Sequence, residues 1–207
     1  MHTPKLYREE DRSRILEFIQ QNEFATLVNY NGQRPLASHL LVEVIEEGEK
    51  LLVNGHMSRA NPLWKTFEHH PEVLVIFQGP HTYISPTWYN HVNVPTWNYQ
   101  AVHVYGTVHL VTEYDETYHL LERLIDRHEK NSHYKMESLP QHFVEKEIRG
   151  IMAFQIEVTG IEANYKLSQN RNDEDYWNIV SNLENREDEL SHGVAEAMKE
   201  QRPQKVE

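Results

Sequence analysis

Three residues in the segment Gly55–Phe67 have the chemistry of an anion-binding site. The sequence of this segment, GHMSRANPLWKTF, places Ser58 and Asn61 where either can cap a helix, and Pro62 falls in the first turn, where its missing N–H costs nothing. Free backbone amides, the positive end of the helix dipole and the guanidinium of Arg59 would then converge on one anion. The alternative is an ordinary capped helix whose Arg59 is solvated.

A second polar cluster follows late in the chain, in the run Lys166–Arg171 (KLSQNR). Neither cluster contains a Ser-His-Asp order or a pair of carboxylates suited to general acid–base catalysis. The 14 histidines are scattered, and no HExxH or similar metal-binding spacing occurs. His69 and His70 are adjacent on an expected helix, so they point apart and form a poor chelating pair. We therefore expect no metal site.

Between the two clusters lies an aromatic stretch, Phe77–Gly106, which also contains three prolines and three histidines. A plain core strand does not explain this composition, because proline cannot donate to a sheet ladder and is normally kept to edges and turns. Flat aromatic surface beside polar side chains suits a planar ligand or a close-fitting partner. The alternative is an aromatic sheet core. The aromatic residues inside the stretch are Tyr83, Trp88, Tyr89, Trp97, Tyr99 and Tyr105.

An anion-binding segment, a flat aromatic surface and neighbouring amide side chains together suit a phosphorylated, planar ligand that forms hydrogen bonds. Flavin mononucleotide (FMN) has all three properties. Since such a cofactor supplies the difficult chemistry itself, the residues alone do not decide between a binding protein and an enzyme.

The composition narrows the class of protein. The chain has 207 residues, a formal net charge of −12 and no cysteine, so disulfides and thiolate metal sites are excluded. The length indicates one domain, or one domain with a helical appendage. An acidic protein without a basic run repels the phosphate backbone of DNA. No signal segment or membrane-spanning apolar run is visible, so we expect a soluble cytoplasmic protein.

The periodicity of apolar residues predicts antiparallel strands early in the chain and helices late. Asn31-Gly32 is expected to form a tight hairpin turn, because both positions favour a positive φ. No early connection is long enough for a parallel crossover. The expected strands are Phe24–Tyr30, Pro35–Ile45, Lys50–Asn54, Val73–Phe77, His103–Val111 and Ile151–Val158. The expected helices are Arg8–Asn22, one beginning near Arg59, Tyr114–Lys130, one around His142–Arg149, Tyr176–Leu183 and Glu187–Glu200.

Five strings of residues resemble the PaiB family, in the family's order and over nearly the whole chain. They are PLASHL (Pro35–Leu40), GHMSRANPLW (Gly55–Trp64), FQGPHTYISPTWY (Phe77–Tyr89), VPTWNYQAVHVYG (Val94–Gly106) and KLSQNR (Lys166–Arg171). Members of this family are described as FMN-binding negative transcriptional regulators linked to protease synthesis and sporulation in bacilli. The resemblance implies an α+β fold, an antiparallel split β-barrel of the flavin-reductase-like kind with peripheral helices and a helical C-terminal segment. It also implies a homodimer that holds flavin at the subunit interface.

The resemblance also assigns roles by position. Ser58, Arg59 and Asn61 would hold the phosphate of FMN. The edge of the isoalloxazine ring would be lined by Ala37, Ser38, His39 and Gln78. The late cluster would contribute Lys166, Gln169 and Asn170. The barrel would span 1–171, and 172–207 would form a C-terminal helical extension on the same domain.

Three functions remain open at this level. The first is a flavin-binding regulatory protein of the PaiB type, acting on protease and sporulation genes directly or indirectly. The second is a flavin-dependent reductase or oxidase that uses the same pocket. The third is a haem-binding split-barrel protein, which the many histidines suggest.

Overall fold

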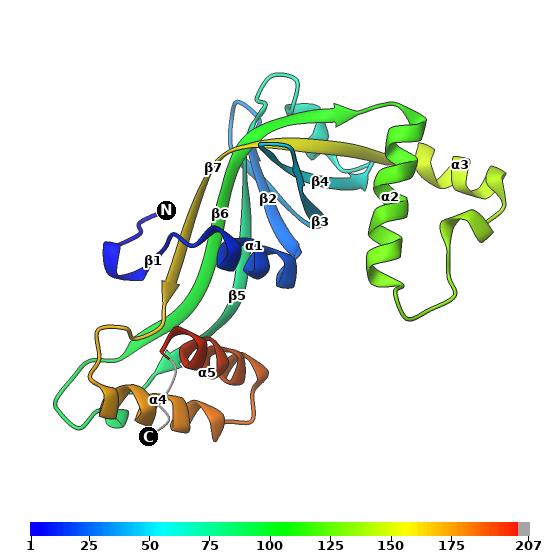
Figure 1. Cartoon of the computed structure of the whole chain (residues 1–207). Coiled ribbons are helices and arrows are strands. Elements are labelled where there is room, and N and C mark those ends of the chain that lie inside the picture. Colours follow the sequence, from blue (N-terminus) through cyan, green and yellow to red (C-terminus); the bar gives the residue numbers. More distant parts are fainter. Residues whose placement is uncertain (203–207) are drawn as a thin grey trace. The chain divides into compact units, whose positions relative to one another are not determined.

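The computed structural model describes residues 1–202 (Figure 1). The chain divides into two compact units. Unit 1 comprises Met1–Phe18, Gln78–His103 and the chain from Glu162 onward, and unit 2 comprises Ile19–Phe77 and Val104–Ile161. The predicted boundary after Arg171 stays a prediction, and the last part of the predicted extension, 203–207, lies outside the described residues.

Antiparallel strands form the framework of the described chain. In sheet order the strands are β1-β7-β4-β3-β2-β5-β6, and β6 also pairs with β7, so all strands except β1 close into a ring. The predicted antiparallel α+β split barrel is therefore confirmed. The strands are β1 (Arg8–Glu9), β2 (Phe24–Tyr30), β3 (Pro35–Glu47), β4 (Lys50–Ser58), β5 (Glu72–Ile84), β6 (Thr96–Val111) and β7 (Ile151–Lys166).

Helices occupy the connections and the end of the described chain. The α-helices are α1 (Arg12–Gln21), α2 (Tyr114–His128), α3 (Gln141–Arg149), α4 (Asp173–Glu184) and α5 (Glu189–Gln201). Short 3-10 helices are η1 (Lys5–Tyr7), η2 (Pro62–Thr66), η3 (Pro86–Trp88) and η4 (Met136–Ser138). Within residues 1–202, no helix is long and apolar enough to cross a membrane.

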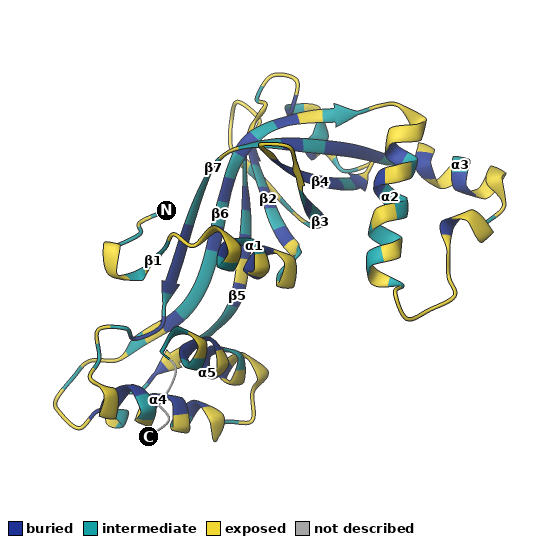
Figure 2. Cartoon of the chain, viewed as in Figure 1, coloured by how far each residue is buried: buried dark blue, intermediate teal, exposed yellow. Residues whose placement is uncertain are grey.

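The core of unit 2 follows from the two-residue period of its strands. Along β2, Ala25, Leu27 and Asn29 are buried and alternate with more exposed neighbours, as a half-buried strand requires (Figure 2). The register pairs Leu27 with Ser38, which puts Ser38 on the same face of the sheet as this buried row. The packing is close: a Cβ added to Gly106 of β6 would lie 2.5 Å from the carbonyl oxygen of Glu157 in β7.

The core of unit 1 is built largely from α4 and α5. The side chains of Tyr176, Leu183 and Met198 are fully buried, and the Tyr176 hydroxyl donates to the Met198 carbonyl at 2.6 Å. Pro80 of β5 meets Gly193 of α5, where an added Cβ would lie 2.6 Å from the proline ring. This contact explains why β5 continues through a proline to Ile84, although the sequence predicted a strand that ends at Phe77.

Two local predictions are wrong. The helix expected from Arg8 begins at Arg12, because Arg8 and Glu9 pair with β7 instead and the Asp11 carboxylate accepts from the backbone N–H of Ser13. The loop after β2 spans 31–34 rather than a two-residue turn: Gly32 has a φ of +85°, but the side chain of Asn31 accepts from the backbone of Arg34 at 2.9 Å. Strands β3, β4, β6 and β7 are also longer than predicted, as β5 is.

Candidate functional site

Two predicted site residues, Ser38 and Asn61, are joined by a hydrogen bond beside the end of β4. Ser58 is the last residue of β4, and Asn61 lies three residues further on, where its side-chain oxygen accepts from the Leu63 amide and caps η2. The Asn61 Nδ2 donates to the Ser38 hydroxyl of β3 at 2.9 Å. The hydroxyl of Ser38 and the loop after β4 are therefore held together by a side chain that the sequence had assigned to the same site.

Arg59 is fixed at its base and exposed at its tip. Its backbone N–H donates to the Gly150 carbonyl and its Nε to the Arg149 carbonyl, both at 2.9 Å, where α3 ends. Among the described residues, none accepts from its Nη atoms. The guanidinium therefore keeps its outer donors available for an anionic ligand, in a position set by two carbonyls at a helix C-terminus.

The prediction of a helix that begins near Arg59 is wrong. The prediction that backbone amides of this segment are free to bind an anion is also wrong. The helix here is η2, a 3-10 helix of 5 residues capped by Asn61 rather than Ser58. The Asn61 amide donates to the Ser58 carbonyl, and the Ala60 amide to the Ser58 hydroxyl oxygen. Because these amides are taken, an anion at this loop must be held by side chains, with Arg59 as the charged group.

A pocket of about 380 Å³ opens beside this loop in unit 2. Two predicted site residues from different strands, His39 of β3 and Ser58 of β4, both line it. The His39 ring stacks against Phe24 with ring centroids 6.1 Å apart, which supplies a flat apolar surface. The full lining is Phe24, His39, Leu40, Leu41, His56, Met57, Ser58, Glu147, Gly150 and Ile151.

His56 is a site residue that the sequence reasoning missed. It lines the same pocket, its buried Nδ1 has no hydrogen-bond partner among the described residues, and burial lowers the pKa of its imidazole. A neutral imidazole can accept or donate one hydrogen bond, so His56 is suited to a polar atom of a ligand. Its spacing of two from Ser58 places both on one face of β4, which is the signal that could have identified it.

The remaining residues predicted for the ring edge are dispersed. Ala37 is exposed on β3, and Gln78 is exposed at the first residue of the β5 segment in unit 1. The late cluster also belongs to unit 1, where Lys166 donates to the Thr96 hydroxyl and Asn170 is exposed. Gln169 accepts from the Leu167 amide and donates to the Tyr165 carbonyl, so both ends of its amide serve the local turn. Their roles at a flavin ring stay predictions.

A second pocket of unit 2, of about 540 Å³, is larger than the first. Its lining includes Tyr30, Pro35 and Tyr105 but none of the predicted site residues. The one buried amide in it, that of Asn29, already donates to Thr66 and to the His70 carbonyl. The smaller pocket is therefore the better candidate, because it alone combines a charged neighbour with an unsatisfied polar atom.

A closed antiparallel ring with peripheral helices and a polar loop at the end of β4 defines a split β-barrel of the kind found in flavin proteins. Two solved structures have this fold: the flavocytochrome Anf3 from Azotobacter vinelandii (TM-score 0.59, 16% identity, 85% of this chain and 78% of the other covered) and the FAD and heme binding protein from Mycobacterium smegmatis (TM-score 0.55, 14% identity, 77% and 73% covered).

Sequence comparison identifies the family. Residues 1–160 match the model of the family described as "Putative FMN-binding domain". The chain is 40% identical over 202 residues to the protease synthase and sporulation protein PAI 2 of Bacillus subtilis, covering 97% of both chains. A more distant relative is an uncharacterised protein of Aspergillus fumigatus, 26% identical over 72% of each chain. The chain therefore belongs to this FMN-binding domain family and to its PaiB branch, which confirms the family predicted from the five sequence strings.

Proposed function

We propose that this chain binds FMN in the smaller pocket of unit 2 and acts as a flavin-dependent regulator of protease synthesis and sporulation genes. The observation that carries the proposal is the common pocket of His39 and Ser58, which the sequence had assigned separately to the ring and to the phosphate. The family match and the relative named for protease synthesis and sporulation support the cofactor and the process.

The residues present fit FMN at both of its ends. At the phosphate end, the Ser58 hydroxyl and the Nη donors of Arg59 supply a charge-assisted contact. At the ring end, the stacked Phe24 and His39 offer a flat face, and the unpaired Nδ1 of His56 offers a hydrogen bond to a ring heteroatom. When bound, the flavin supplies electron and hydride transfer, and the protein supplies binding, orientation and electrostatics.

A large exposed side chain beside the pocket supports a homodimer. The pocket, of about 380 Å³, lies at the small end of the roughly 300–1,000 Å³ that ligand pockets usually measure. Phe24 beside it is 69% exposed, an unusual position for a large apolar side chain. A second copy covering Phe24 would complete the pocket, over an interface of about 2,000 Å² or more. A monomer of half the expected mass in sedimentation velocity, with flavin bound, would refute this part.

We also propose that this chain is a negative regulator of these genes and that it does not bind operator DNA directly. A formal net charge of −12 opposes association with the phosphate backbone. The two helices α2 and α3 are also separated by the segment 129–140, far longer than the turn of three or four residues that a helix-turn-helix uses. The flavin would then act as a sensor whose state changes binding to another protein.

A haem-binding function is the second candidate, because two histidines, His39 and His56, line the same pocket. An imidazole is a common axial ligand of haem iron. Titrating cofactor-free protein separates the two candidates, since flavin binding quenches flavin fluorescence whereas histidine-ligated haem gives a sharp, shifted Soret band. Saturable FMN binding that is tighter than riboflavin binding supports the flavin proposal. Equal affinities for the two flavins, or no binding, would overturn it. Turnover of NAD(P)H by the flavin-loaded protein would instead favour a reductase.

A further inference from the structure

The larger pocket of unit 2 takes no part in the proposed flavin site. It measures about 540 Å³ and shares no lining residue with the smaller pocket. That volume lies within the roughly 300–1,000 Å³ of pockets that take small molecules. The walls come from strands β2, β3, β5, β6 and β7, all within one compact unit. A pocket of this size, built on paired strands, is a candidate site for a second ligand.

The register of β2 and β5 brings an aliphatic pair, a tyrosine and a carboxylate onto one face of the sheet. Val28 is paired with Leu74, and both are partly exposed, whereas Val73 of β5 is buried. Tyr30 and Glu72 each lie two residues beyond this pair, so their side chains are on the same face as it. The pair, Tyr30 and Glu72 all line the pocket. One face of the sheet therefore supplies apolar, aromatic and charged groups to a single cavity.

Two tyrosines line the pocket from different strands, Tyr30 of β2 and Tyr105 of β6. Tyr30 is 45% exposed, and its ring contacts the ring of His70 at an interplanar angle of 71°, with centroids 5.7 Å apart. The register also pairs Tyr30 with Pro35 of β3, which is another lining residue. The face of a tyrosine ring carries negative potential, so it attracts a cation as well as an apolar group.

Glu72 is the only charged side chain among the residues that line this pocket. Its carboxylate forms no hydrogen bond or ion pair with any residue in the described range 1–202. Glu72 is exposed, so the carboxylate is hydrated in the free protein and can pair with a cation. The one amide side chain of the pocket is fully used, because Asn29 donates to Thr66 and to the His70 carbonyl and accepts from the Tyr30 amide. The charge of this pocket is therefore negative.

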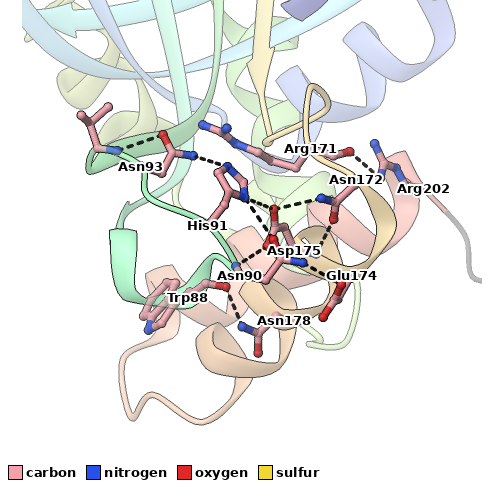
Figure 3. Close-up of polar contacts among 11 residues, drawn as sticks. Trp88, Asn90, His91, Asn93, Arg171, Asn172, Glu174, Asp175, Asn178 and Arg202 are labelled. Atoms are coloured by element: carbon pink, nitrogen blue, oxygen red, sulfur yellow. Dashed lines mark hydrogen bonds and ion pairs between the residues drawn. The ribbon is translucent and has the colours of Figure 1, made fainter.

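A carboxylate with a role in the fold is held differently, as the buried Asp175 of unit 1 shows (Figure 3). Asp175 accepts from the backbone N–H of Asn90 at 2.8 Å and from the side chain of Asn172 at 3.1 Å, and it lies 3.1 Å from Nδ1 of His91. These contacts join a loop to the start of α4. Glu72 has no contact of this kind, so removing its charge should leave the fold intact.

We propose that this pocket binds a small amine that carries a positive charge and an apolar or aromatic group. The ammonium would pair with Glu72, and the apolar group would lie against Tyr30 and Leu74. A formal net charge of −12 attracts cations to the surface, and together with Glu72 it disfavours anions such as FMN in this pocket. The site goes beyond the proposed flavin function, since the two pockets have no residue in common. An amine bound here would be an effector of a regulatory protein.

The probe that tests the proposal is 2-phenylethylamine, because it joins a flat ring to an ammonium group. It is titrated into the full-length protein, with and without saturating FMN, and followed by ligand-detected NMR. A probe of this size should have a Kd of about 1 mM or below, and FMN should not change it. Two analogues with the same ring vary the charge: 2-phenylethanol is neutral and 3-phenylpropionate is an anion. The amine should bind about two- to fivefold more tightly than the alcohol, as an exposed ion pair predicts, and the anion should bind most weakly.

Two variants isolate the carboxylate. Glu72→Gln should remove the preference for the amine over the alcohol and leave the affinity for the alcohol and the melting temperature unchanged. Glu68→Gln is the matched control, because Glu68 is also exposed and has no side-chain partner among the described residues, but it does not line the pocket. Both variants change the net charge equally, so an effect of net charge alone would appear in both. Tyr30→Leu should weaken the binding of all three compounds by about two- to tenfold, because the aromatic contact is lost.

Several outcomes would overturn the proposal. The amine would have to fail to bind, or bind no more tightly than 3-phenylpropionate. Equal losses of amine affinity in Glu72→Gln and Glu68→Gln would also overturn it, as would a Tyr30→Leu variant that binds all three compounds as well as the unaltered protein does. Competition between the amine and FMN would contradict it too, because the amine would then occupy the smaller pocket.

Discussion

Replacing Arg59 by alanine removes the only charge that the proposed phosphate contact depends on. A hydrogen bond between charged partners contributes roughly 1.5–3 kcal/mol, and each 1.4 kcal/mol changes a dissociation constant about tenfold. The Kd for FMN should therefore rise by about ten- to a hundredfold. Riboflavin has no phosphate, so its Kd should stay within about twofold of the original value, since only the ring contacts remain.

The structure also gives Arg59 a role in the fold, which the same variant removes. Its Nε donates to the Arg149 carbonyl at 2.9 Å, and the loss of one such exposed bond costs up to about 1 kcal/mol. For a chain of this length that corresponds to a fall of about 2–4 °C in melting temperature. A modest fall in stability is thus expected and does not by itself make the arginine structural. The ratio of FMN to riboflavin affinity is the decisive quantity, measured by quenching of flavin fluorescence.

Arg149→Ala is the matched control for the loss of charge. Its side chain is exposed, and the carbonyl that anchors Arg59 is part of the backbone and remains. FMN affinity should fall by less than about threefold in this variant, because water and salt screen an exposed charge that makes no direct contact with the ligand. Equal losses of FMN and riboflavin affinity in Arg59→Ala would refute the placement of the phosphate, and so would equal FMN losses in the two arginine variants.

Three further predictions concern other parts of the chain. Burial lowers the pKa of His56 below its ordinary 6.5, so its contribution to stability is present above that pH and is lost as the pH falls through the folded-state pKa. His56→Gln should therefore lose less stability than the unaltered protein between about pH 7 and pH 5 in urea unfolding. Gly106→Ala should cost about 1–3 kcal/mol by overpacking, whereas Gly160→Ala, with no atom within 4 Å of the added Cβ, should be nearly neutral in thermal unfolding. In gel shifts at physiological salt, nanomolar protein should not form a sequence-specific complex with promoter DNA, and a complex lost on scrambling the site would contradict this.

Strand β2 could be predicted from the sequence because its alternation is undisturbed. β2 has the predicted bounds Phe24–Tyr30, and its buried residues follow the period of two. The later strands were predicted too short because their continuation depends on contacts that no local pattern encodes. β5 continues past Phe77 because Pro80 packs against Gly193, a residue more than a hundred positions away in the chain.

The region around Arg59 shows how a correct local signal gave a wrong element. Asn61 and Pro62 do start a helix, as their residue types predict. The position of that start depends on β4, which continues to Ser58 because it pairs with β7 as far as Ile151. The strand therefore extends to the point where the first helical turn was expected to begin. As a result, Arg59 is held by the carbonyls of Arg149 and Gly150 at the end of α3 and does not lie beside free backbone amides.

The polar run KLSQNR could be recognised from the sequence, but the separate role of each of its residues could not be predicted. Gln169 satisfies two backbone groups of its own turn, and Ser168, with a φ of 60° and a hydrogen bond to Asn98, holds the turn in place. At the ends of the run, Lys166 donates to the Thr96 hydroxyl and Arg171 lies over the ring of Tyr89. Residues that a motif groups as one site thus have separate structural tasks, and these tasks depend on contacts with Asn98, Thr96 and Tyr89 that no local pattern encodes.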